Sequence, residues 1–513
     1  MRSPFFRILL TVCLLLVSST YAIAQQPSED DHPDSTTITY THPGDTVWID
    51  HVTGSRIHLQ RLFGSDTLVM TKRSVILPVL EAVSINHAVW AFDHYATDRE
   101  WARIDIHSIR RNLRHNFTLD LDSYSGNQFS HPYHGSMFYN AARYHGNSYY
   151  AASLYPLIGS MMWEYFCETN YPSYNDFIST GFGGTAIGEA TFRMSDIAFD
   201  NSSTGVKRIF HELAGTVLNP SRGLHRLLSG EMWHVSPSRG KHIQPEPFSF
   251  DVGVGNRYMH ETRNLHRNKR VGYIDFQINY GDRFADKEHA HPYDWFRMHT
   301  LINLSQSDPT FSDVDIRGRI LSTQYESSRH WQFDIGLYQN YRYIDNYGDQ
   351  DEQRPGDYAL INEACSFGTG LYAQKLGTHV SFSNDLLFSA VPFGGTTADY
   401  YQARRYNFAT GFSLRNDIRV TLNNYGAIGD DLYFARLYVP KGPRNPHEPG
   451  LYDWGDKGNN SILYNRAYLL INMRYNLKLN AEHIYYIRKS NYSYFPSRQA
   501  RNYELKLGLI YSI

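Results

Sequence analysis

The sequence predicts a mixed fold, in which a mainly helical segment precedes an antiparallel transmembrane β-barrel of about 10–12 strands. From about Phe250 onward, long stretches of apolar and polar residues alternate. Aromatic residues make up 15% of the chain, with 40 Tyr, yet the mean hydropathy is −0.48. Membrane barrels combine aromatic girdles with a polar average, because only one face of each strand meets lipid. A start typical of exported proteins is the third observation.

That start is a predicted signal peptide over residues 1–24. Basic Arg2 and Arg7 precede an apolar run over residues 8–17, and an Ala-Ile-Ala tripeptide ends at Ala24. The apolar run is shorter than a membrane-spanning helix requires. We therefore expect export with cleavage after residue 24, and the alternative is an uncleaved N-terminal anchor. Residues 25–75 are expected to form a polar leader.

Charge and cysteine content exclude two further classes. The net charge is −2 and the pI is about 6.9, so no basic bias suggests a nucleic-acid partner. Cys13 lies in the predicted signal, and Cys167 and Cys365 fall in different regions, so a disulfide framework is not indicated. After the signal, no stretch reaches the roughly 18 apolar residues of a membrane helix.

Residues 76–235 are expected to form a mainly helical domain. Apolar residues recur at a spacing of three and four over residues 79–95. Further helical candidates cover residues 136–144, 151–167 and 209–218. This domain is predicted either to plug a barrel lumen or to pack at its periplasmic mouth.

Residues 250–513 are expected to form the barrel, because the period changes to two. The clearest alternating stretches are residues 272–282, 331–344, 407–423, 468–482 and 503–513. These lengths approach or exceed the 9–11 residues of a tilted membrane strand. A soluble sandwich, the alternative, typically has strands of about 5–6 residues. The polar stretches 345–357 and 440–460 would then be extracellular loops.

The last alternating stretch, residues 503–513, also favours a membrane barrel over a soluble sandwich. One face carries Tyr503, Leu505, Leu507, Leu509, Tyr511 and Ile513, and the opposite face carries Glu504, Lys506 and Ser512. Outer-membrane barrels characteristically end on such a strand, which the barrel assembly machinery reads. We therefore expect an outer-membrane location, with outer-membrane lipid and the assembly machinery as partners.

Several short sequence words lie between residues 127 and 189. They are His131-Pro132-Tyr133 with Gly135, Tyr139-Asn140-Ala141-Ala142-Arg143, Trp163-Glu164, Pro172-Ser173 with Asn175-Asp176, and Gly188-Glu189. Their order resembles the domain of unknown function 3943 family, an uncharacterised group of Gram-negative envelope proteins. The resemblance covers at most about residues 101–232. It implies a Gram-negative envelope setting and brings no assigned activity.

The same stretch concentrates ionisable residues among apolar ones. The candidate catalytic residues are His131, His134, Arg143, Glu164, Glu168, Asp176 and Glu189. These types can act as metal ligands or as general acids and bases, so a hydrolytic site is one interpretation. The preferred interpretation is an internal polar network, because buried carboxylates must be paired or protonated. Whether the site holds a metal or another cofactor stays open.

No established catalytic motif decides between a hydrolytic site and an internal polar network. His211 and Glu212 begin like the helical zinc motif, but Gly215 stands where its second His is required. A nucleophile elbow of the Gly-x-Ser-x-Gly type is missing. We therefore predict an outer-membrane barrel protein of structural, scaffold or transport-related role. The alternative is a membrane-embedded hydrolase acting on envelope lipid or glycolipid.

Overall fold

The chain divides into two compact units. The computed structural model describes residues 73–236, 239–243, 246–261, 269–284, 291–306, 308–327, 330–346 and 358–512. The helical unit contains the described residues up to 120 and those of 134–245, and the barrel unit contains residues 121–133 and those from 246 onward. The predicted signal peptide and nearly all of the predicted leader lie outside the described residues.

Residues 76–228 are mainly helical. The α-helices are α3 (Ile76–Ala91), α4 (Ile106–Asn112), α5 (His131–Tyr144), α6 (Tyr149–Ala152), α7 (Leu154–Phe166), α8 (Tyr174–Ile178), α9 (Gly184–Ala198), α10 (Gly205–Leu218) and α11 (Pro220–Leu228). The short π- and 3₁₀-helices are η1 (Phe92–Ala96), η2 (Glu100–Ala102), η3 (Gly126–Ser130) and η4 (Ser179–Gly183). Within the described residues, every helix is too short or too polar to cross a membrane.

Helix α5 begins earlier than the sequence predicted. The sequence predicted a helix over residues 136–144, but α5 begins at His131, so that His131 and Pro132 belong to it as well. The chain enters α5 directly from η3. Proline has no N–H, so Pro132 cannot donate to a backbone carbonyl of η3. The predicted helix start at residue 136 was therefore five residues too late.

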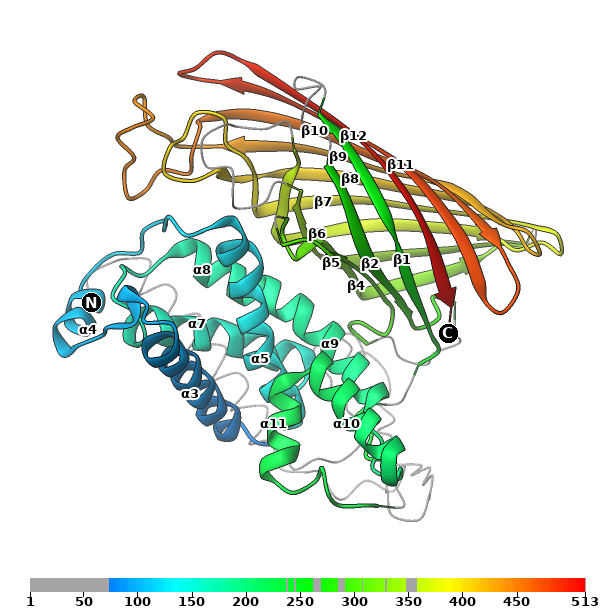
Figure 1. Ribbon diagram of the computed structural model, residues 1–513, viewed down its shortest axis with the longest axis horizontal. Helices are drawn as coiled ribbons and strands as arrows, with labels where there is room; N and C mark the ends of the chain where they lie inside the picture. The colour runs from blue at the N-terminus through cyan, green and yellow to red at the C-terminus, as the bar shows by residue number, and fades with distance from the viewer. Residues whose placement is uncertain are drawn as a thin grey trace, which may run out of the picture. The chain divides into compact units, whose positions relative to one another are not determined.

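The barrel unit is a closed barrel of twelve antiparallel strands (Figure 1). The strands are β1 (Phe248–Glu261), β2 (Lys269–Tyr280), β3 (Phe296–Asn303), β4 (Phe311–Glu326), β5 (Trp331–Asp345), β6 (Leu360–Lys375), β7 (Val380–Thr397), β8 (Tyr406–Leu422), β9 (Gly426–Val439), β10 (Gly458–Asn472), β11 (Leu477–Tyr492) and β12 (Arg498–Ser512). Each strand pairs with its sequence neighbours, and β12 closes the barrel against β1. The predicted fold class is confirmed, at the upper end of the expected strand number.

One predicted strand is in fact a hairpin. Residues 468–482 were expected to form a single strand, but β10 ends at Asn472 and β11 begins at Leu477. The turn between them places Tyr475 and Asn476 at φ of 61° and 58°. Positive φ at both central residues is the geometry of a tight hairpin turn. Apolar and polar residues go on alternating through this turn, so the pattern alone does not show it.

The two faces of the strands separate as the alternation predicts. On β12, Leu505 and Leu507 are 46% and 53% exposed on the outside, whereas Glu504 and Lys506 are 2% and 3% exposed inside. Exposed apolar side chains recur around the outer wall, at Val254, Ile335, Leu371, Leu386, Phe388, Phe412, Ile428, Leu469 and Leu479. An apolar outer wall around a polar interior is the arrangement of membrane barrels.

The connections between strands differ at the two barrel ends. Turns of three or four residues at one end join β4 to β5, β6 to β7, β8 to β9 and β10 to β11, and the C-terminal end of β12 lies beside them (Figure 1). Longer connections occupy the other end, including residues 346–359 between β5 and β6 and residues 440–457 between β9 and β10, whereas the connection from Tyr280 to Phe296 between β2 and β3 is a long one at the end with the short turns. The connections at 346–359 and 440–457 coincide with the polar stretches expected to form long loops.

Residues 121–133 cover part of the outer wall of β5. Tyr341 and Tyr343 share the outward face of β5 with exposed Ile335, yet they are 0% and 1% exposed. The Tyr341 hydroxyl donates a hydrogen bond to a backbone carbonyl of this segment. The ring of Tyr124 stacks on Tyr343 with centroids 5.2 Å apart. The barrel unit thus shields these two tyrosines with its own N-terminal segment.

Candidate functional site: two buried clusters and a polar lumen

The predicted site residues separate into two buried clusters. In the first, Arg143 on α5 faces Glu189 on α9. Arg143 donates from Nε to Glu189 Oε2 at 2.8 Å and from Nη2 to Oε1 at 3.2 Å. Arg193 donates to Oε1 at 2.7 Å and the Tyr139 hydroxyl to Oε2 at 2.7 Å. All four side chains are at most 2% exposed.

Close helix packing positions this first cluster. A Cβ added at Gly188 would lie 2.6 Å from the ring of Tyr139, so only glycine lets α9 approach α5 at this point. Burial and the neighbouring Glu189 carboxylate raise the pKa of Tyr139 well above its usual value. Tyr139 therefore remains a neutral donor. With both oxygens of Glu189 satisfied, the Arg143–Glu189 cluster has the features of a clamp between two helices.

The second cluster surrounds Glu164 near the end of α7. Glu164 is 0% exposed, and its Oε2 accepts the backbone N–H of Ser173 at 2.7 Å. Burial, followed by the negative charges of Glu168 and Asp176, raises the pKa of Glu164 well above its usual value. These surroundings therefore favour the neutral, protonated form of Glu164. The other carboxyl oxygen, Oε1, is buried and has no hydrogen-bond partner in the part of the chain that the structure describes.

Local capping explains the rest of the Glu164 cluster. Ser173 is the N-cap of α8, and its hydroxyl both accepts from the Asp176 backbone and donates to the Asp176 carboxylate. The Asn175 amide donates to Asp176 at 2.8 Å. Asn112 donates to the backbone carbonyl of Glu168 at 3.0 Å near the end of α7. These contacts tie α4, α7 and α8 together, which is the work of a structural network.

The two predicted histidines lie elsewhere on α5. The ring of His134 packs against Phe138 and Trp163, with centroids 4.6 and 5.2 Å away. His131 is partly buried in the first turn of the helix. Among the described residues, neither histidine belongs to a group of three or more ligand atoms within 4.8 Å of one another. The sequence-predicted residues are therefore not gathered into one metal site there.

The last helices of the unit bury charge and expose apolar residues. On α10, Arg208 and Glu212 are 7% and 5% exposed, and Arg226 of α11 donates to Glu212 at 2.6 Å. The same helix leaves apolar side chains more than half exposed, at Val206, Ile209, Phe210, Leu213 and Val217. A further buried ion pair joins Arg222 of α11 to Asp196 of α9 at 2.8 Å. The helices are thus joined by ion pairs rather than by an apolar core.

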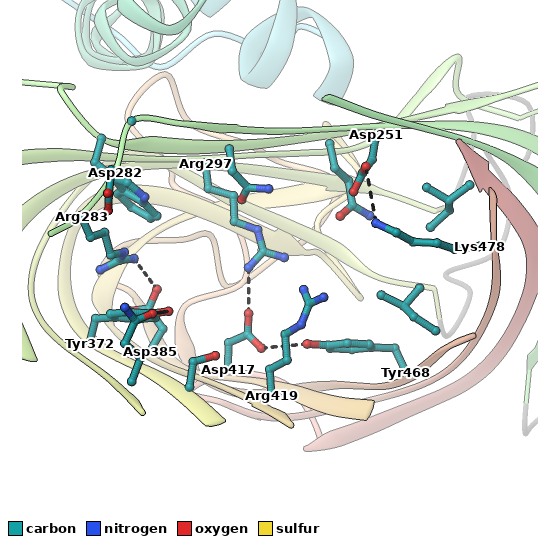
Figure 2. A pocket seen from close by; sticks show the side chains of 18 of the residues that line it. Asp251, Asp282, Arg283, Arg297, Tyr372, Asp385, Asp417, Arg419, Tyr468 and Lys478 are labelled. Atoms are coloured by element: carbon teal, nitrogen blue, oxygen red, sulfur yellow. Dashed lines mark hydrogen bonds and ion pairs between the residues drawn. The ribbon is translucent and has the colours of Figure 1, made fainter. Parts of the chain in front are cut away.

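The barrel interior holds a polar cavity near the end with the short turns (Figure 2). Its volume is about 470 Å³. Arg297 reaches Asp417 at 2.7 Å, and the Tyr468 hydroxyl donates to the same carboxylate at 3.4 Å. Charged residues of both signs line the cavity in equal number: Asp251, Asp282, Asp385, Asp417 and Glu482 with Arg283, Arg297, Arg419, Arg466 and Lys478. Sequence alternation assigned several of these to polar faces, but it could not place them across the lumen from one another.

The opposite half of the lumen is packed with side chains. Inward-facing residues near the long connections form one buried apolar cluster, which includes Ile344, Ile361, Val391, Tyr433, Leu437, Ile462, Ile484 and Tyr486. Between this cluster and the cavity, Arg415 pairs with Asp315 at 2.5 Å, and Arg257 with Glu504 at 2.8 Å. The barrel fills its own interior over much of its length.

Comparison with protein-family models gives a match to part of the chain. Residues 116–221 match the family model described as Domain of unknown function (DUF3943), as the sequence words predicted. None of the curated protein sequences matches the chain significantly.

Solved structures resemble the chain over about half of its length. One is a KdgM porin in complex with disordered oligogalacturonate, with 13% identity, 51% of this chain and 99% of that chain covered, and a TM-score of 0.23. A NanC porin has 9% identity, coverages of 51% and 98% and a TM-score of 0.26. The Pseudomonas putida toluene transporter TodX has 9% identity, coverages of 52% and 90% and a TM-score of 0.22.

Proposed function

We propose that this chain, which carries a DUF3943 segment, is an outer-membrane protein whose barrel acts as a closed anchor and scaffold for its helical unit. The observation that carries the proposal is the packed lumen. An inward-facing apolar cluster and a set of buried ion pairs occupy the space through which a solute would diffuse. Export through a cleaved signal peptide and assembly through β12 are parts of the same proposal.

The outer wall supports the membrane location. Apolar side chains such as Phe388, Ile428 and Leu507 are 52%, 57% and 53% exposed on successive parts of the wall. Soluble proteins rarely expose contiguous apolar patches larger than a few hundred Å². Lipid contact removes this cost, and bacterial barrels with an even strand number occur in the outer membrane.

The packed interior supports an anchor rather than an open pore. Opening it would separate charged partners such as Arg415 and Asp315, whose side chains are 1% and 25% exposed. Breaking a buried pair by removing one partner typically costs about 3–5 kcal/mol. The lumen should therefore stay closed under ordinary thermal motion.

A second, transport-related role draws support from one observation, the cavity near the short turns. A volume of about 470 Å³ lies within the range of small-molecule sites. Its lining carries acidic and basic groups in equal number, so a small solute carrying both charges would find partners. The hydrolase alternative draws no comparable support from Glu164, because that carboxyl group is fully buried.

Single-channel recording tests the closed anchor. Purified full-length protein is inserted into planar lipid bilayers, and we expect no long-lived open-channel current at moderate voltage. The double variant Arg415→Ala/Asp315→Ala removes a pair from the packed part of the lumen, and should raise the frequency of brief openings. Arg436→Ala is the matched control, because Arg436 bonds Ser461 in an exposed position. Stable porin-like currents from the wild type would overturn the anchor and favour transport.

A further inference from the structure

We propose that Glu81, His145 and His225 form a binding site for one transition-metal dication of the Zn²⁺ type. Among the described residues, these three are the group whose ligand atoms all lie within 4.8 Å of one another. Glu81 Oε1 lies 2.7 Å from His145 Nε2 and 2.9 Å from His225 Nδ1. Two imidazoles and one carboxylate are a ligand set that zinc uses in catalytic sites, where a fourth position is left to water.

The distances suit an ion after a small expansion. Zinc bonds to His nitrogen and carboxylate oxygen at about 2.0–2.2 Å, so tetrahedral ligand atoms lie about 3.3 Å apart. The two separations in the structure are about half an ångström shorter than that. Rotation of the side chains alone can supply the difference. Each neutral imidazole then carries its proton on the other ring nitrogen, so that a lone pair faces the ion.

Rigid elements hold the three ligands in place. Glu81 lies in the middle of α3, and His145 directly follows α5 in a turn where Gly146 has a φ of 76°. This turn is fastened to the start of α3, because the Ser74 backbone N–H donates to the His145 carbonyl at 3.1 Å. His225 lies on α11. Ligands fixed by separate rigid elements form a preorganised site.

Neighbouring contacts orient His225 further. Arg222 and Arg226, which flank it on α11, are both fully buried in ion pairs with Asp196 and Glu212. The ring of Tyr144 packs against His225 with centroids 4.2 Å apart. The rotation of α11 about its axis is therefore set by contacts outside the metal site.

The site is reachable from solvent. The side chains of Glu81 and His225 keep 27% and 28% of their surface exposed, whereas His145 keeps 10%. An ion can enter on the exposed side, and a water molecule can complete its coordination there. The mixture of imidazole nitrogen with a single carboxylate favours Zn²⁺, Ni²⁺ or Cu²⁺ over Ca²⁺ and Mg²⁺, which prefer oxygen ligands.

The competing interpretation is a metal-free clamp, in which Glu81 accepts one N–H from each imidazole. Glu81→Gln separates the two, because the Gln amide oxygen still accepts hydrogen bonds but no longer supplies a charged ligand. The second variant is the double substitution His145→Ala/His225→Ala. His87→Ala is the control, because His87 lies on the same helix and contacts only the backbone carbonyl of Val83.

The experiment uses tag-free, full-length protein in detergent micelles. After equilibration with Zn²⁺ and gel filtration, metal is counted by mass spectrometry, and affinity is measured by competition with a chromophoric chelator. We expect one Zn²⁺ per chain in the wild type and His87→Ala, and none in the double variant. Glu81→Gln should bind at least tenfold more weakly, and Zn²⁺ should raise the melting temperature of the wild type and of His87→Ala but not that of the double variant.

Three results would overturn the proposal. One is a wild-type protein that holds no stoichiometric zinc and shows no zinc-dependent melting shift. Another is a double variant that retains the zinc of the wild type, because the ion would then be bound elsewhere. If Glu81→Gln binds as tightly as the wild type, the carboxylate is no ligand and the three-residue site is rejected.

Discussion

Arg143 and Glu189 form a two-point ion pair between α5 and α9, with hydrogen bonds of 2.8 and 3.2 Å and no solvent exposure of either residue. Such a pair is weak evidence of net stability, because both charges lose their hydration. It does mean that neither residue can be removed alone without leaving a buried, poorly compensated charge.

Replacing Arg143 should therefore destabilise the helical unit. We expect Arg143→Ala to lower its free energy of unfolding by about 3 kcal/mol, and Arg143→Lys to lower it as well, since a lysine cannot make both bonds. Denaturant unfolding followed by circular dichroism measures the change. The control is Arg103→Ala, which removes an exposed pair with Asp98 and should leave stability unchanged. Equal stabilities of Arg143→Ala and wild type would contradict the clamp.

Gly188 should prove equally sensitive. In Gly188→Ala, the new Cβ would meet the Tyr139 ring at 2.6 Å, so one of the two helices must move. Overpacking of this kind typically costs about 1–3 kcal/mol, although alanine is the better helix former. Gly205→Ala provides a contrast, because nothing lies within 4 Å there, although its φ of 59° carries its own strain. A Gly188→Ala protein with an unchanged midpoint would show that α5 and α9 are not in close contact.

The raised pKa of Glu164 makes a prediction about pH. A carboxyl group whose folded pKa exceeds its unfolded value stabilises the fold fully below the unfolded pKa, near 4.5, and loses that contribution as pH rises toward the folded pKa. Within that window the loss is about 1.4 kcal/mol per pH unit. Glu164→Gln keeps an acceptor for the Ser173 N–H and has no proton to lose. Its melting temperature should therefore decline less with rising pH than that of the wild type, and parallel curves would refute a neutral Glu164.

The alternation of apolar and polar residues was enough to predict the barrel but not the ends of its strands. The barrel was predictable, because lipid on one side and charges on the other impose a period of two on every strand. The hairpin at Tyr475 and Asn476 was not, because a tight turn with positive φ interrupts pairing without interrupting alternation. The strand count could therefore be given only as a range.

The helical unit shows a second limit of prediction from sequence, which concerns the buried face of a helix. The 3.6-residue period identified α10, but periodicity does not say which face is buried. In the structure, Arg208 and Glu212 lie inside, while Val206 and Phe210 are both 68% exposed. An apolar stripe is usually assigned to the core, and here the ion pairs between helices reverse that assignment.

The proposed metal ligands Glu81, His145 and His225 could not be predicted from local sequence patterns. Glu81 lies 64 positions from His145 and 144 from His225, on three different elements. Zinc motifs are recognised from short, regular spacings, so a set assembled by tertiary packing leaves no such signature. The close pair His131 and His134 has a ligand-like spacing, but the structure places His134 against aromatic rings.

The barrel seam offers a further test. Arg257 on β1 forms an ion pair with Glu504 on β12 at 2.8 Å, and both side chains are 2% exposed. Removing the arginine leaves a buried carboxylate where the sheet closes. We expect Arg257→Ala to unfold at a lower temperature in heat-modifiability gels, in which folded barrels migrate apart from unfolded chains. Arg270→Ala is the control, because Arg270 is an exposed residue of β2. An unchanged transition would mean that backbone pairing alone closes the barrel.

The apolar outer wall makes the sharpest prediction, because it separates a membrane barrel from a water-soluble one. Leu507 is 53% exposed on β12, and in a bilayer this exposed surface would meet lipid. A charged residue facing the bilayer midplane costs about 2–4 kcal/mol, whereas the same change on a wet surface costs little. Leu507→Arg should therefore lower the unfolding free energy in phospholipid vesicles by an amount in that range, and Leu507→Phe should leave it nearly unchanged. If Leu507→Arg is as stable as the wild type, β12 does not face lipid at this position.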